Sequence, residues 1–177
     1  MRSITLDIET TGIEVSKGHK IIEIGCVELY NNYTTGKVWH TFVNPNRKIP
    51  VEAYKIHGIS EEFLRDKPTF AHIADDFLSF IEGSSLIIHN TAFDLMFLNY
   101  ELENINKKNL KQFKIIDTLT LAKKLYPDMP ASLSALSKKY KINTNNINKP
   151  STICEAEILA DIYVKMLAEK DPSEKKI

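Results

Sequence analysis

Cysteine is scarce in this chain, with two in 177 residues. Cys26 and Cys154 lie far apart in apolar segments, so they provide neither a disulfide framework nor the paired spacing of a zinc site. We interpret both as small core residues. The cysteines therefore exclude a disulfide-stabilised scaffold and show no cysteine-based zinc pattern.

The chain also lacks an excess of charge of either sign, because 23 Lys and Arg residues balance 23 Asp and Glu residues. This balance excludes a protein that holds a long nucleic acid through a general basic field. Any contact with nucleic acid is expected to be local and assisted by metal ions.

Long hydrophobic runs are missing as well, and no stretch approaches the length of a membrane span. The apolar N-terminal segment is too short for a signal peptide and already carries acids. We therefore expect a cytoplasmic protein without a membrane partner. A hydrophobic content of 43% over 177 residues predicts one globular domain with a proper core.

The most informative feature that is present is a pair of carboxylates on one short apolar strand. Asp7 and Glu9 are two residues apart, so a strand directs both to one face and Ile4, Leu6 and Ile8 to the other. Leaving such charges unpaired on an apolar strand is costly. Two divalent cations would neutralise them, and such a pair of ions is used to cleave phosphodiesters. The alternative is a strand end with two solvated acids.

The hydrophobic pattern predicts an α/β fold, a mixed sheet with helices packed on it. Strands are expected over residues 4–8, 20–30, 38–43, 86–88 and 113–116, with residues 31–37 as a hairpin turn. Helices are expected after Ser60 and over residues 68–81, 91–104, 118–125, 132–140 and 152–168. A polar, Asn-rich loop is expected over residues 143–150. The domain is expected to cover residues 1–168, with residues 169–177 as a charged, frayed tail.

A third acid, Asp94, lies in an almost wholly apolar segment just after the strand expected over residues 86–88. This context disfavours a solvated surface role for its carboxylate. The alternative is an acid in the first turn of a helix, where the helix dipole stabilises a negative charge.

Two motifs, D-I-E-T-T-G at residues 7–12 and H-N-T-A-F-D at residues 89–94, resemble the first two motifs of the DEDD exonucleases. Segments at residues 18–25, 56–63, 66–70, 117–119 and 132–136 resemble one branch of that family, the proofreading epsilon subunits of bacterial DNA polymerase III. The resemblance covers residues 3–168. It implies a ribonuclease-H-like fold and 3′→5′ hydrolysis of nucleotides from a single-stranded DNA 3′ end. The implied protein partner is the alpha subunit of the polymerase.

The resemblance also implies which residues bind metal and substrate. The ligands of a two-metal site for Mg²⁺ or Mn²⁺ would include Asp7, Glu9 and Asp94. The residues whose backbone approaches the terminal nucleotide would be Thr10, Thr11 and Gly12, and glycine permits close approach because it has no Cβ. The residues that line the nucleotide pocket would be His57, Asn90 and Phe93. Each of the last three has a structural alternative, as a turn cap, a helix N-cap and a core side chain respectively.

The third motif departs from the family pattern, which has a histidine as general base and, five residues later, an aspartate as the fourth metal ligand. Those positions hold Pro150 and Glu155, and no histidine follows His89. A general base contributes typically about 10²–10⁴-fold to the rate, whereas divalent ions activate water themselves. We therefore expect a slow enzyme. Mn²⁺ should be the better activator, because Mg²⁺ demands near-ideal octahedral geometry.

Glu155 is open to two interpretations. It shares a helix face with Leu159, Ile162 and Met166, which favours a catalytic role as the fourth ligand, directed toward the core. Alternatively, Glu155 closes a capping box by accepting a hydrogen bond from the amide of Thr152.

Two other functions remain open beside the DNA exonuclease. The changes at Pro150 and Glu155 favour a non-catalytic replicase subunit that keeps the fold and holds the polymerase or the primer end. The intact Asp7, Glu9 and Asp94 argue against such full decay. The other alternative is an RNA-trimming exonuclease of the same superfamily.

Overall fold

The computed structural model describes residues 1–144 and 149–170 and contains a mixed five-stranded sheet in the order β3-β2-β1-β4-β5. The central strand β1 (Arg2–Thr10) pairs antiparallel with β2 (Ile21–Tyr30), which pairs antiparallel with β3 (Tyr33–Phe42). On its other side, β1 pairs parallel with β4 (Ser85–Ile88), and β4 pairs parallel with β5 (Lys114–Asp117). The predicted mixed sheet is confirmed.

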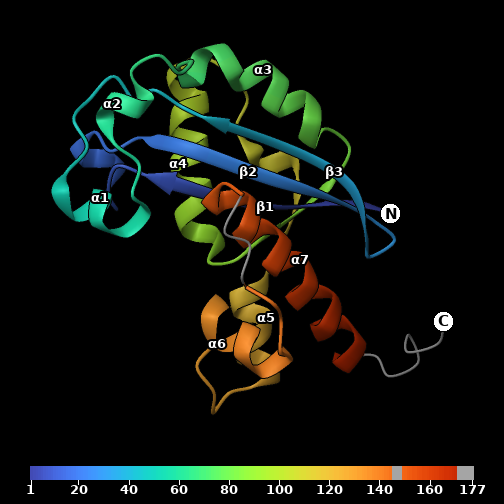
Figure 1. Cartoon of the computed structure of the whole chain (residues 1–177). Coiled ribbons are helices and arrows are strands. Elements are labelled where there is room, and N and C mark those ends of the chain that lie inside the picture. Colours follow the sequence, from blue (N-terminus) through green and yellow to red (C-terminus); the bar gives the residue numbers. More distant parts are fainter. Residues whose placement is uncertain (145–148, 171–177) are drawn as a thin grey trace.

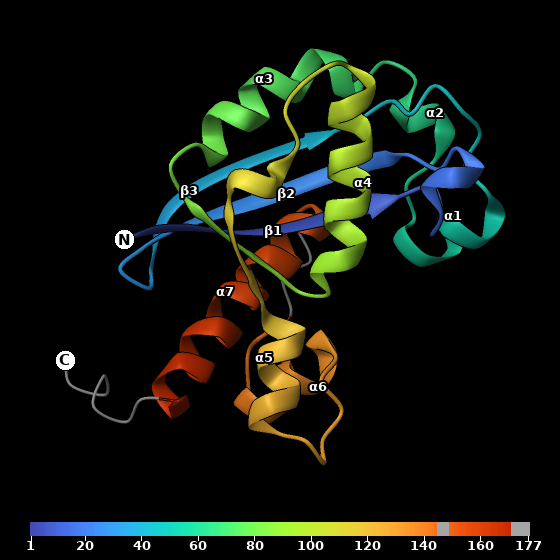
Figure 2. The same ribbon diagram turned by 180° about the vertical axis from the view of Figure 1, so that it is seen from behind.

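Helices cover both faces of this sheet (Figures 1 and 2). Helices α3 (Phe70–Ile81) and α4 (Thr91–Asn104) lie on one face, and α7 (Ser151–Lys170) crosses β1 and β2 on the other. The shorter elements are α1 (Val51–His57), α2 (Glu61–Leu64), α5 (Thr118–Leu125), α6 (Leu133–Tyr140), η1 (Val15–Lys17) and η2 (Leu110–Gln112). Helices α5 and α6 pack against α7. No helix within residues 1–144 and 149–170 has both the length and the apolar character that a membrane span requires.

The main hydrophobic core lies between the sheet and the pair α3 and α4. Ile4, Leu6 and Ile8 of β1 contribute to it, as their alternation predicts. The rings of Phe77 and Phe97, both 0% exposed, fill the space between the layers. The opposite face of β1, which carries Asp7 and Glu9, is therefore directed toward α7.

Helix α7 approaches that opposite face closely. Thr5 Oγ1 on β1 donates a hydrogen bond to the carbonyl oxygen of Ala156 at 2.8 Å. On β2, a Cβ at Gly25 would lie 2.5 Å from the carbonyl carbon of Thr152, so only glycine permits this packing. The start of α7 consequently lies directly over the centre of the sheet.

The connection between β2 and β3 differs from the expected seven-residue turn. Strand β3 begins at Tyr33, and the turn consists of Asn31 and Asn32 alone. Their φ angles of 50° and 67° lie in the left-handed region that a two-residue hairpin turn requires and that Asn tolerates. The Asn-Asn pair was the decisive signal within a polar segment that we interpreted as one long turn.

Helix α1 was missed by the sequence analysis. It has only one buried residue, Ala53, so no apolar stripe indicates it. Its boundaries are nevertheless those of a short helix, with Pro50 before it and Gly58 at φ 71° after it. The other predicted strands and helices are confirmed within two residues at each end. The expectations for residues 145–148 and 171–177 fall outside the described residues.

Replacing Phe77 with alanine tests the position of the core. Phe77→Ala should lower the free energy of unfolding by about 3–5 kcal/mol, because the ring is fully buried. Tyr33→Ala is the control, since that aromatic is 68% exposed on the edge strand and should cost less than about 1 kcal/mol. Urea unfolding followed by circular dichroism measures both values, and equal losses would contradict the core described here.

Candidate active site

Three elements bring four carboxylates together at the centre of the molecule. Strand β1 supplies Asp7 and Glu9, the first turn of α4 supplies Asp94, and the start of α7 supplies Glu155. Burial raises the pKa of Asp7 well above its ordinary value, and repulsion from Glu155, Asp94 and Glu9 adds to the shift. The four acids predicted from the three sequence motifs thus form one electrostatically coupled group.

The pKa values of Asp94 and Glu9 are raised as well. Burial raises the pKa of Asp94, which is 5% exposed, although backbone amides of Asp94 and Ile8 donate hydrogen bonds that oppose the shift. Burial also raises the pKa of Glu9 to about 7, and repulsion from Glu155 and Glu23 adds to it. The bond from Ile8 links the start of α4 to β1, so it helps to hold Asp94 beside the strand.

Glu155 lies on the open side of this group rather than facing the core. Leu159, Ile162 and Met166, on the same helix face, are buried. At Glu155 that face reaches the solvent, and the side chain is exposed. Partial enclosure of its carboxyl group still raises the pKa of Glu155, and repulsion from Glu23 contributes. The expected orientation toward the core is therefore wrong, while the proximity to the other acids is retained.

The capping-box interpretation of Glu155 is also wrong. The amide of Thr152 donates instead to Glu23 Oε1 on β2, at 3.4 Å, and Thr152 Oγ1 donates to the same oxygen at 2.8 Å. Glu23 is an acid inside the apolar strand predicted over residues 20–30, and the sequence analysis gave it no role. That is the same signal that singled out Asp7.

Oxygen donors of this kind suit Mg²⁺ and Mn²⁺. In the described part of the chain, no three His, Cys, Asp or Glu side chains are drawn together tightly enough to hold an ion in the observed conformation. Burial, together with repulsion between neighbouring carboxylates, raises the pKa values of Asp7, Glu9 and Asp94, so their charged forms are destabilised. A divalent cation would relieve this repulsion, so the donor set fits one.

A cavity of about 530 Å³ opens beside Glu9. It is lined by five of the six residues predicted to contact a nucleotide, namely Thr10, Thr11, Gly12, His57 and Phe93. Asn90 is not among the lining residues. It occupies the N-cap position of α4 with φ at 67°, as the structural alternative predicts, but its side chain makes no capping hydrogen bond with the described residues.

His57 and Phe93 have structural contacts in addition to lining the cavity. His57 Nδ1 accepts a hydrogen bond from the amide of Ile59 at 3.0 Å, which stabilises the turn after α1. Its Nε2 is buried and has no hydrogen-bond partner among residues 1–144 and 149–170. Burial lowers the pKa of His57, so the ring is neutral with its proton on Nε2. Phe93 packs against Phe97, with the ring centroids 5.0 Å apart.

In the structure, the space beside Gly12 is occupied by His19, which the resemblance did not predict. A Cβ at this position would lie 2.4 Å from the ring of His19, and Thr11 Oγ1 lies 3.1 Å from His19 Nδ1. Any larger residue at position 12 would displace the ring of His19, a cavity residue that the sequence analysis did not select. The other walls that it missed include the exposed apolar side chains Ile13 and Ile56.

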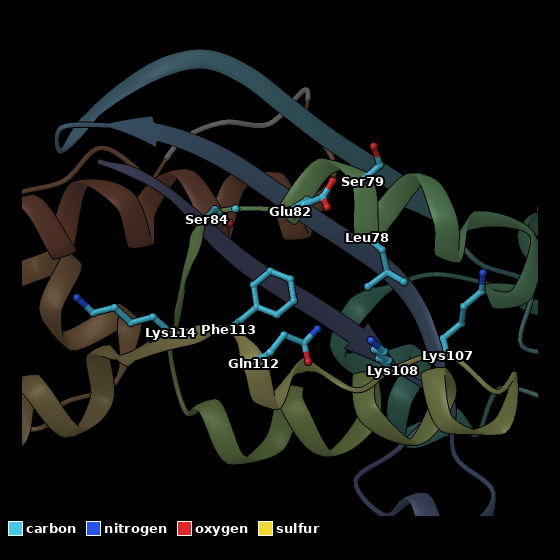
Figure 3. Close-up of a pocket in the computed structure, with 10 residues that line it drawn as sticks. Leu78, Ser79, Glu82, Ser84, Lys107, Lys108, Gln112, Phe113 and Lys114 are labelled. Carbon is cyan, nitrogen blue, oxygen red and sulfur yellow. The ribbon is translucent and has the colours of Figure 1, made fainter.

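A second cavity, of about 630 Å³, lies at the opposite end of the sheet. Figure 3 shows Leu78 and Phe113 in it, with Lys107, Lys108 and Lys114 around its margin. It borders the amino ends of β4 and β5, whereas Asp94 follows the carboxyl end of β4. Its lining includes one acid, Glu82, and none of the four coupled carboxylates. The smaller cavity is lined by Glu9 and is therefore the candidate substrate pocket.

Comparison with known proteins identifies the family of this chain. The family model described as "Exonuclease" matches residues 4–146. A DNA polymerase III subunit epsilon of Rickettsia typhi is 45% identical over 100% of this chain and 79% of its own length. The Escherichia coli protein of the same name is 42% identical over 93% of this chain and 71% of its own. The solved nuclease domain of 3′hExo, a DEDDh family member bound to rAMP, matches with a TM-score of 0.79 and 19% identity, over 95% of this chain and 92% of that one.

The fold and its central carboxylates thus define a ribonuclease-H-like nuclease domain. The similarity in sequence is more specific than the similarity in fold. The chain belongs to the DEDD exonuclease family, in which its full-length relatives are epsilon subunits of bacterial DNA polymerase III.

The raised pKa of Glu9 predicts how stability depends on pH. An acid whose pKa rises on folding, here from 4.5 to about 7, stabilises the folded state at low pH. That stability is lost as the pH rises through about 7. In EDTA at pH 8, Glu9→Gln should therefore be more stable than the natural chain by about 1–3 kcal/mol, and the gain should vanish toward pH 4.5. Urea unfolding at both pH values measures it, and a variant less stable than the natural chain at pH 8 would contradict the repulsion.

Proposed function

We propose that the chain is a metal-dependent exonuclease that removes nucleotides from a single-stranded DNA 3′ end, as the proofreading subunit of a replicative DNA polymerase. The observation that carries the proposal is the meeting of Asp7, Glu9 and Asp94 beside a cavity lined by the predicted nucleotide-binding residues. The similarity to epsilon subunits over the whole chain supports it.

The acids on β1 and α4 would hold a pair of divalent ions, with Glu155 as a fourth ligand from α7. Their carboxylates would rotate toward the ions, since they stand apart in the observed conformation. Bound Mg²⁺ or Mn²⁺ would supply activation of water and stabilisation of the charge that develops on the phosphate. The oxygen of a water molecule would bond to phosphorus and give up a proton to solvent. The bond to the 3′ oxygen of the preceding sugar would break, and that oxygen would take up a proton from solvent.

The cavity residues would hold the terminal nucleotide in position. The backbone of Thr10, Thr11 and Gly12 runs along the cavity, from the strand that carries the acids. The Nε2–H group of His57 is a buried donor that a phosphate or sugar oxygen of the nucleotide would satisfy. Phe93 offers a ring face for contact with the base.

The third motif predicts a slow reaction. Pro150 cannot accept a proton, and it occupies the position where the family resemblance places the general base. Losing such a base costs typically about 10²–10⁴-fold. The carboxylate of Glu155 is one methylene longer than that of aspartate, and a misplacement on the order of 1 Å can cost about 100-fold. Mn²⁺, which is less demanding in geometry, should therefore support more activity than Mg²⁺.

A second function, a non-catalytic replicase subunit, is favoured by the same two positions. The fold would then hold the polymerase or the primer end while Pro150 and Glu155 record the loss of chemistry. In either case we propose a cytoplasmic protein that binds the alpha subunit of the polymerase, on the strength of its similarity to epsilon subunits.

The first experiment measures nucleotide release from a DNA oligomer with a mispaired 3′ end, in Mg²⁺ and in Mn²⁺. We expect slow release that is faster in Mn²⁺ and that Asp7→Ala abolishes, because Asp7 lies at the centre of the coupled acids. The double variant Pro150→His with Glu155→Asp should raise the rate by about 10²-fold or more.

Three results would revise the proposal. Absence of turnover in the natural chain, with recovery in the double variant, would establish the non-catalytic subunit. Faster hydrolysis of an RNA oligomer of the same sequence would identify RNA as the substrate. Turnover that survives Asp7→Ala would place the chemistry elsewhere in the molecule.

A further inference from the structure

Glu23 on β2 is a buried carboxylate that the proposed chemistry does not use. It is 0% exposed and stands opposite Glu9 in the pairing of β1 with β2. His40 Nε2 lies 2.9 Å from its Oε1, and Ser151 Oγ donates to its Oε2 at 2.8 Å. Burial alone would raise the pKa of Glu23, but the hydrogen bonds from His40, Ser151 and Thr152 outweigh it and hold the pKa below its ordinary value.

Most of these bonds come from the first turn of α7. The helix begins at Ser151, and the amides of a first turn need acceptors from outside the helix. Glu23 supplies one, because it accepts from both the amide and the hydroxyl of Thr152. A carboxylate on a neighbouring strand therefore does what the helix's own Glu155 was expected to do. The Glu155 carboxylate accepts no hydrogen bond from residues 1–144 and 149–170, so it remains available.

A second contact fixes the helix just beyond Glu155. Thr5 Oγ1 donates to the carbonyl of Ala156 at 2.8 Å, from the face of β1 that carries Asp7. Glu155 consequently lies between two residues of α7 that are anchored to the sheet. Thr152 is anchored to Glu23 on β2, and Ala156 is anchored to Thr5 on β1. Both anchors are buried, with Thr5 and Thr152 0% exposed.

We propose that Glu23 is a positioning residue of the active site. By capping α7 from β2, it fixes the backbone of Glu155 over Asp7 and Glu9 and leaves the Glu155 carboxylate free to bind an ion. The inference rests on the proposed function, because it assigns Glu155 as a ligand. Since a shift on the order of 1 Å at a reacting centre can cost about 100-fold, losing part of this cap should be visible in kcat.

A matched pair of variants at Thr152 tests the cap with little change in shape. Thr152→Val removes the hydroxyl that Glu23 accepts from, whereas Thr152→Ser keeps it. With a mispaired DNA oligomer in Mn²⁺, Thr152→Val should lower kcat about tenfold or more and change KM less than about twofold. Thr152→Ser should keep most of the kcat of the natural chain.

Two measurements besides activity report on the same cap. Amide hydrogen exchange over residues 151–156 should be faster in Thr152→Val than in Thr152→Ser, because the first turn loses an anchor. Calorimetric titration with Mn²⁺ should show affinity weakened about fivefold or more in Thr152→Val, as expected when a supporting residue of a metal ligand is removed.

Glu28 offers a control on the same strand. It is also a buried carboxylate, 6% exposed, and it accepts hydrogen bonds from Arg2 and Thr35 at the far end of β2. Glu23→Ala and Glu28→Ala should both lower stability, but only Glu23→Ala should lower kcat and weaken Mn²⁺ binding. If Glu23→Ala does not fold, the pair at Thr152 decides alone.

The inference would be overturned if the amides of residues 151–156 exchanged faster in Thr152→Val while that variant kept the kcat and the Mn²⁺ affinity of the natural chain. It would also be overturned if Thr152→Val and Thr152→Ser lost equal amounts of kcat and Mn²⁺ affinity, or if Glu23→Ala and Glu28→Ala did. Failure of the proposed function is a different result. In that case the natural chain would show neither turnover nor Mn²⁺ binding that depends on Asp7, and both conclusions would fall.

Discussion

The enclosure and mutual repulsion of a group of carboxylates is the constraint around which this molecule is built. Asp7, Glu9 and Asp94 would each be more stable in water, and burial together with mutual repulsion raises their pKa values. The rest of the fold holds them together against that cost. Strand β1 fixes Asp7 and Glu9 by its packing on α3 and α4, and the amide of Ile8 holds Asp94 beside them. Such stored repulsion is what makes a site attractive to divalent ions.

One buried acid in this region behaves in the opposite way. Glu23 is surrounded by hydrogen-bond donors, so its pKa is lowered and it remains charged, while its neighbours hold their protons more tightly. The difference follows from what each side chain touches. Donors from β3 and the start of α7 stabilise the charge on Glu23, whereas no side chain of the described residues donates a hydrogen bond to the acids of the coupled group. Structural and chemical roles are thus separated between two neighbouring sets of carboxylates.

Much of this arrangement could be predicted from the sequence. The alternation around Asp7 identified the central strand, and the apolar surroundings of Asp94 marked the third acid. The cap of α7 could not be predicted, because it depends on Glu23 and Thr152, which are far apart in the chain. A local pattern suggested a capping box at Glu155, but a tertiary contact took its place. Helix α1 and the first half of β3, residues 33–37, were missed because both are mostly exposed and lack an apolar pattern.

The changes in the third motif leave two functions to distinguish, an active exonuclease and a non-catalytic subunit. Pro150 removes the expected base, but the acids of β1 and α4 are intact and coupled, so the account requires that they bind metal. Diffraction from crystals soaked in Mn²⁺ tests this requirement most directly, because the anomalous signal locates the ion. The account predicts Mn²⁺ between Asp7, Glu9 and Asp94, with the Glu155 carboxylate turned toward it. Crystals in which Mn²⁺ binds elsewhere, or not at all, would contradict the central claim.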